Sequence, residues 1–233
     1  MALTLKQMLD AVMLESSLDP ETVYYTATDY ATRRLVALAD RSATRLSTQH
    51  TWQALRRTYS FSLSTDTDYA MPDDFRELVP DTAYQNDYIE SIDMRTDPGW
   101  WGYLQSASGG SGMRGRFRIL GGRLHVYEPV SGDDVRFEYV SSHPILATDG
   151  TTTRARWGAD TDTFKLDDDL LIMDVTWRYQ RLIGLESWED HRGEFNTYLR
   201  TVKGQEAGAK TIIGGEYAMG FQEPYTDLWV DNP

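Results

Sequence analysis

Apolar positions in the first fifty residues repeat with the period of an α-helix. The first run opens with a capping box formed by Thr4 and Gln7. Its apolar residues follow at helical spacing: Leu5, Met8, Leu9 and Val12. A second, longer run begins after Thr28 or Asp29, either of which can cap a helix, and extends to about Ser47. The pattern predicts two amphipathic helices in succession.

From Tyr59 the period changes to two, which is typical of half-buried strands. Aromatic and aliphatic residues alternate with serines over residues 59–64. Residues 66–68 then form a turn, and residues 69–71 form a short return strand. This strand must end at Pro72, because proline has no N–H to donate to a sheet.

A hairpin is predicted over residues 116–127. The pair Gly121 and Gly122 separates two five-residue runs, and paired glycines allow the positive φ angles of a tight turn. Further alternating apolar residues give another strand: Val135, Phe137 and Tyr139. The middle of the chain is therefore expected to be a small antiparallel β unit.

Helical spacing returns in the last third of the chain. Three acids lie where a helix N-terminus favours negative charge: Asp167, Asp168 and Asp169. The apolar positions of this helix follow: Leu170, Leu171, Val175, Leu182 and Leu185. Gly184 and Gly193 are expected to bend or break it. Residues 143–163 lack periodicity and are rich in Thr, Asp and Gly, so a connecting loop is predicted there.

These elements predict an α+β fold, a helical bundle with an inserted small antiparallel β unit and an extended C-terminal tail. Five parts are expected along the chain: N-terminal helices (1–57), the β unit (58–142), the connecting loop (143–163), C-terminal helices that pack on the N-terminal helices (164–206), and the tail (207–233).

Charge and composition narrow the classes of function. The 233-residue chain has a formal net charge of −13, which would repel a polyanion and argues against tight nucleic-acid binding. It has no cysteine, which excludes disulfides and thiolate zinc sites. The absence of cysteine fits assembly in a reducing cytoplasm, and neither a membrane span nor a signal-peptide pattern is visible.

No motif predicts a metal, a cofactor or a catalytic centre. The histidines are scattered: His50, His125, His143 and His191. Asp160 and Asp162 lie outside any calcium-loop spacing, so turn and capping duties are expected of them. Carboxylate pairs for glycoside cleavage can be drawn from Glu77, Asp81, Glu128 and Glu138. In a chain with 36 acids, surface charge is the favoured interpretation.

Aromatic and basic residues indicate interaction surfaces instead. Trp100 and Trp101 could stack on sugars, although packing in the core or at a subunit interface is favoured. Arg116 and Arg118 point to one face of a strand and are expected to pair with acids of a neighbouring subunit. Four aromatic residues of the tail are predicted to anchor it on a partner: Tyr217, Phe221, Tyr225 and Trp229.

Several short segments follow one another in a fixed order: WQALR at 52–56, YAMP at 69–72, RFRI at 116–119, GGRL at 121–124, FEYVS at 137–141 and LDDDLL at 166–171. In this order the chain resembles the head-to-tail adaptor proteins of short-tailed bacteriophages, the tail-tubular or tail-accessory group. The resemblance extends over roughly residues 28–213.

The resemblance implies a structural protein of the virion neck, without cofactor or enzymatic activity. It implies a ring, commonly of twelve subunits, whose helical part packs around the portal protein and whose β part faces a tail nozzle or tail tube protein. DNA would pass through the ring without specific binding, and no membrane is involved. A peptidoglycan-cleaving tail protein and a glycan-binding module are the alternatives.

Overall fold

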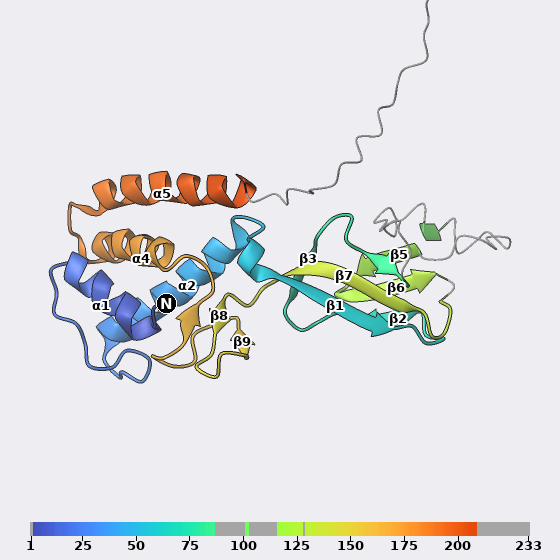
Figure 1. Ribbon diagram of the computed structural model, residues 1–233. Coiled ribbons are helices and arrows are strands. Elements are labelled where there is room, and N and C mark those ends of the chain that lie inside the picture. Colours follow the sequence, from blue (N-terminus) through green and yellow to red (C-terminus); the bar gives the residue numbers. More distant parts are fainter. Residues whose placement is uncertain (1, 87–100, 103–115, 128, 209–233) are drawn as a thin grey trace, which may run out of the picture.

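Helices and long strands lie at opposite ends of the molecule. The computed structural model describes residues 2–86, 101–102, 116–127 and 129–208. In this part of the chain, the helical end contains α1 (Leu5–Glu15), α2 (Tyr30–Thr48), α4 (Asp168–Ile183) and α5 (Trp188–Gly208). The N-terminal and C-terminal thirds of the sequence therefore build one helical unit, and the middle of the chain extends from it as strands (Figure 1).

Three helix starts predicted from the sequence lie in the described residues, and each has a side-chain cap. The capping box of Thr4 and Gln7 forms at α1. Asp29, rather than Thr28, caps α2, and Asp167 caps α4 by accepting a hydrogen bond from the N–H three residues later. These contacts satisfy amides that have no partner inside a helix, which explains why the predicted starts are confirmed.

Gly184 separates the last two helices. It ends α4 with a φ of +81°, a left-handed angle that favours glycine. The second glycine expected to interrupt this region, Gly193, lies inside the regular helix α5. The helix continues to Gly208, so residues 207 and 208, predicted as the start of the tail, are helical. The rest of the predicted tail lies outside the described residues.

Within the residues that the structure describes, seven strands form a small sandwich of two antiparallel sheets. In one sheet the central β7 (Asp134–Ser141) has β1 (Arg56–Ser62) on one side and both β3 (Phe75–Leu78) and β4 (Tyr84–Gln85) on the other. In the second sheet β6 (Arg123–Tyr127) lies between β2 (Asp68–Ala70) and β5 (Arg116–Leu120).

The predicted hairpin of the second sheet is confirmed. β5 pairs with β6, and the turn residues Gly121 and Gly122 have φ angles of +59° and +74°. The predicted return strand pairs differently from expectation, because β2 joins β6 and not the preceding strand β1. The chain leaves the first sheet at Leu63, which donates to the Asp133 carbonyl, and joins the second at Thr67, which accepts from Val126.

The prediction of a connecting loop over residues 143–163 is wrong in part. This region contains β8 (Ile145–Leu146) and β9 (Thr153–Arg154), which form a third small sheet with β10 (Thr163–Phe164). Strands of two residues are too short to show the alternation by which strands are recognised. Asp162 supports the sheet by accepting hydrogen bonds from the amides of Gly158 and Ala159 at 2.7 and 3.0 Å.

Apolar side chains form one core in the helical unit and a second between the two sheets of the sandwich. The two units are joined firmly, because Val79, just after β3, and Val140 of β7 belong to the helical core. Arg76 on β3 adds hydrogen bonds to the Ser47 and His50 carbonyls at the end of α2. The α+β prediction is confirmed. Within the described residues, no helix combines the length and apolarity needed to cross a membrane.

Candidate functional site

Large apolar side chains are exposed together at the end of the helical unit that lies away from the sheets. We call this surface the end patch; it consists of Leu14, Leu18, Leu182, Ile183 and Leu185, at and just beyond the last turns of α1 and α4. These are five of the ten large apolar side chains that are exposed in the described part of the chain, and Leu14 is the most exposed of the five at 64%. Clustered exposure of this kind marks interaction surfaces in soluble proteins.

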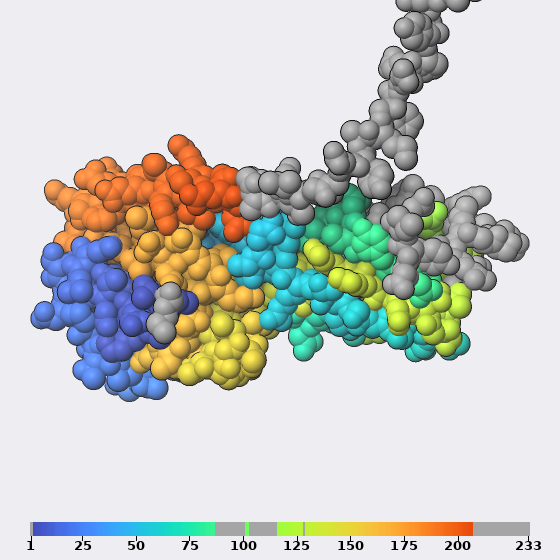
Figure 2. All heavy atoms as spheres, in the orientation of Figure 1, coloured from blue at the N-terminus to red at the C-terminus, as the bar shows by residue number. Residues whose placement is uncertain are grey.

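Contacts between helix ends bring these residues together. The Thr176 hydroxyl donates to the Glu15 carboxylate at 2.8 Å, and the Gln180 side-chain amide donates to the Glu15 carbonyl at 3.2 Å. The last turns of α1 and α4 therefore lie side by side. Figure 1 shows both ends beside the start of α5, and Figure 2 shows N-terminal residues (blue) and α4–α5 residues (orange) on one surface at that end.

The sequence pattern placed part of the end patch in the core. Leu182 and Leu185 continue the apolar spacing of α4, yet they are 43% and 37% exposed. Spacing shows which face of a helix a residue occupies, but not where the neighbouring helix ends. At the last turn of α4 the packing against α1 and α2 stops, so the apolar face continues into solvent.

A buried ionic network holds α2 against α4 behind the end patch. The Asp174 side chain is fully buried and forms ion pairs with Arg45 and Arg178, while the Trp177 indole N–H donates to it at 3.0 Å. Burial raises the pKa of the Asp174 carboxyl, and the charge of Arg45 acts against that rise. A carboxylate shared by groups on two helices fixes their relative position.

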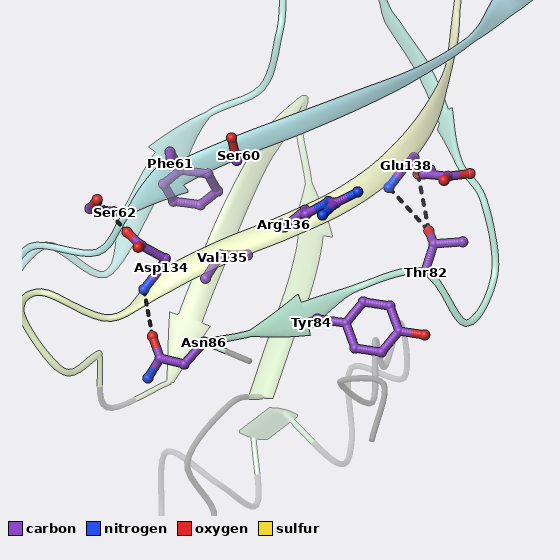
Figure 3. Close-up of a pocket in the computed structure, with 10 residues that line it drawn as sticks. All are labelled: Ser60, Phe61, Ser62, Thr82, Tyr84, Asn86, Asp134, Val135, Arg136 and Glu138. Atoms are coloured by element: carbon purple, nitrogen blue, oxygen red, sulfur yellow. Dashed lines mark hydrogen bonds between the residues drawn. The ribbon is translucent and has the colours of Figure 1, made fainter. Parts of the chain in front are cut away.

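The outer face of the β1–β7–β4 sheet carries a polar groove of about 840 Å³. Figure 3 shows the residues that line it: Ser60, Phe61, Ser62, Thr82, Tyr84, Asn86, Asp134, Val135, Arg136 and Glu138. Asp134, Arg136 and Glu138 alternate along β7 with residues of the sandwich core, so their side chains share the outer face. The register places Tyr84 beside Arg136, with Ser60 on the other side.

Three of the four residues predicted for a subunit interface, Arg116, Arg118 and Trp101, come together on the second sheet. Phe117, between Arg116 and Arg118, is fully buried, so the two arginines share the outer face of β5. Arg116 lies opposite Tyr127, and Trp101 contacts the Tyr127 ring edge to face with 6.5 Å between ring centroids. Trp101 is only 8% exposed. Trp100 and the four tail anchors lie outside the described residues.

A buried carboxylate joins the strands near the helical unit, and no sequence pattern indicated it. Asp74 accepts hydrogen bonds from the Tyr139 and Ser141 hydroxyls, both at 2.7 Å, and pairs with Arg57 at 3.1 Å. Burial alone would raise the pKa of the Asp74 carboxyl, but these donors outweigh it and hold that pKa below its usual value. Two of the partners are more than sixty residues away in sequence, so spacing gives no signal.

Asp160 and Asp162 have the structural duties expected of them. The Asp160 carboxylate accepts from the amides of Tyr24 and Tyr25 at 3.2 and 2.8 Å, which fixes the segment before α2. The residues that the structure describes contain no group of three or more His, Asp or Glu side chains that could hold a metal ion.

The candidate carboxylates for glycoside cleavage have separate surroundings. Glu77 pairs with Arg76 at 2.7 Å. Asp81 occupies a turn with a φ of +60°. Glu138 lines the groove, and Glu128 lies outside the described residues.

Together, a helical unit with an apolar end and a sandwich with polar outer faces are typical of a protein that works through interfaces. A family model described as SU10 adaptor protein matches residues 3–212. The match covers both units and most of the chain, and the chain therefore belongs to the SU10 adaptor protein family. The resemblance to phage head-to-tail adaptors is confirmed. No curated protein matches the sequence significantly.

Proposed function

We propose that this protein is a structural adaptor in the neck of a bacteriophage virion, where it joins the portal to the tail. The observation that carries the proposal is the end patch on a member of an adaptor family. An adaptor has to bind a different partner at each of two ends. This chain has an apolar helical end and a polar sandwich end, and the end patch suits a partner that covers it permanently.

The helical end binds the portal, and the sandwich faces the nozzle or tube of the tail. Burial of the end patch would supply the affinity, since apolar area removed from water is the largest favourable term in association. The aromatic anchors of the tail add a second contact with the portal or a neighbouring subunit: Tyr217, Phe221, Tyr225 and Trp229.

Copies of the chain form a ring, twelve by analogy with the family resemblance, and DNA passes through its centre. The isolated chain is monomeric in this proposal, because a net charge of −13 on each copy gives strong mutual repulsion at low salt. Binding to the portal gathers the copies and outweighs that repulsion. The channel wall is acidic or neutral, so that phosphates slide past it.

The adaptor function needs no catalytic residue. In support, Asp74, Asp160, Asp162 and Asp174 hold the chain together through hydrogen bonds and ion pairs. Replacing Glu77 or Asp81 by its amide is expected to leave particle assembly and infectivity near normal. Loss of infectivity in fully assembled particles would instead favour a hydrolytic role.

The mass of the protein alone and with the portal tests the proposal. Analytical ultracentrifugation of the full chain should give a monomer in low-salt buffer. With the portal protein of the same phage, it should give one complex that contains many copies of the chain. Absence of any complex with the portal would contradict the adaptor function, and a stable ring without the portal would contradict the templated assembly.

A further inference from the structure

Two large apolar side chains are exposed in the described part of the β unit, and they lie on opposite faces of the sandwich. Leu120 is 52% exposed at the end of β5, where the β5–β6 hairpin turns. Tyr84 is 37% exposed on β4 and lines the groove on the other sheet (Figure 3). Single exposed apolar residues are ordinary. These two differ because their surroundings are complementary in shape and charge.

The hairpin tip is a convex, basic element. Leu120 and Arg118 share the outer face of β5, because the residues that alternate with them, Phe117 and Ile119, pack in the sandwich core. Arg123 follows the two-glycine turn, lies opposite Leu120 and pairs with Asp68 at 2.6 Å. Arg118 forms no ion pair with any residue that the structure describes. The tip therefore presents an apolar side chain flanked by guanidinium groups.

The groove is a concave surface with the opposite chemistry. The Tyr84 ring lies in it, and Arg136 is flanked along β7 by the carboxylates of Asp134 and Glu138. Asp134 accepts a hydrogen bond from the Ser62 hydroxyl. Glu138 forms no ion pair with a described residue, and only its backbone groups bond to Thr82. The groove thus offers an aromatic surface and a carboxylate that has no ion-pair partner among the described residues.

We propose that the hairpin tip of one subunit docks into the groove of the next, with Leu120 against Tyr84 and Arg118 against Glu138. The occupant is a second copy of this chain, and the proposal rests on the ring of the proposed function. Tip and groove are on opposite faces of the sandwich, so the contact is heterologous and repeats head to tail. Heterologous contacts close into a ring when the rotation from one subunit to the next closes, whereas a contact of one face with itself would stop at a dimer.

Cysteine cross-linking tests this contact cleanly, because the natural chain has no cysteine. In the double variant Tyr84→Cys/Leu120→Cys, bound to the portal and treated with a short bismaleimide, covalent oligomers longer than a dimer are expected. Each single variant serves as the matched control and should remain monomeric. A dimer from Leu120→Cys alone would show that tips meet tips and would overturn the proposal, as would a double variant that yields no ladder.

Charge reversal provides a second measurement that does not depend on cysteines. Arg118→Glu and Glu138→Arg should each lower the number of adaptor copies retained per portal at moderate salt, and the combined variant should restore it. Failure of the combined variant to improve on either single variant would overturn the proposal. Portal binding is measured first for the unmodified chain. Its absence refutes the adaptor function, whereas binding without a ladder or rescue refutes only the subunit contact.

Discussion

Replacement of two residues of the end patch by serine is expected to weaken portal binding without unfolding the protein. Leu182 and Ile183 are 43% and 44% exposed in the free chain. Full burial of a Leu or Ile side chain is worth about 1.5–3 kcal/mol, so covering the exposed part of each contributes roughly 0.6–1.3 kcal/mol. The double variant Leu182→Ser/Ile183→Ser should therefore lose about 1.3–2.6 kcal/mol, which is roughly 9- to 80-fold in Kd per subunit.

The assay is binding of dilute adaptor to immobilised portal, together with a thermal melt of each variant. The matched control is Leu182→Met/Ile183→Val, which keeps most of the apolar area and should bind within a few-fold of the natural chain. Both double variants change the same two residues in the last turn of α4, so their melting temperatures should be similar. Serine variants that bind within twofold of the natural chain would refute the role of the end patch, as would equal weakening by the conservative pair.

Three further changes test other contacts. Asp174→Ala leaves Arg45 and Arg178 without their buried partner and should lower the free energy of unfolding by about 2–4 kcal/mol, measured by denaturant unfolding. A loss below about 0.5 kcal/mol would show that the ionic network is dispensable. Tyr139→Phe removes one donor to Asp74 and should cost about 1–2 kcal/mol at pH 8. Burial raises the pKa of Tyr139 to about 12, so the stabilisation by its hydroxyl is complete below about pH 10 and is lost as the pH rises towards 12. The difference in stability between the natural chain and Tyr139→Phe should therefore shrink at about pH 11. A difference that stays constant with pH would contradict this. Truncation after Gly214 should leave the melt unchanged and reduce retention on the portal, and unchanged retention would make the tail anchors dispensable.

Local chemistry made the elements of the fold predictable. The capping box at Thr4, the acids at the start of α4 and the glycine pair of the β5–β6 hairpin each act within a few residues, so the sequence contains the whole interaction. Apolar and polar residues alternate along β1 and β7 because one face of each strand packs in the core of the sandwich. The family resemblance depended on the order of such local segments, and the family match agrees with it.

The exposed surfaces could not be predicted from local sequence patterns, because the exposure of a side chain depends on where the neighbouring helices and strands end. Leu182 and Leu185 have the spacing of core residues, and only the ends of α1 and α2 decide that they face solvent. The partners of Asp74 come from β1 and β7, far apart in the chain, and the pairing of β2 with β6 joins segments more than fifty residues apart. Composition and spacing therefore determined the class of fold, and the resemblance of ordered segments to a known family indicated the kind of protein. The end patch and the opposed tip and groove exist only once the chain has packed.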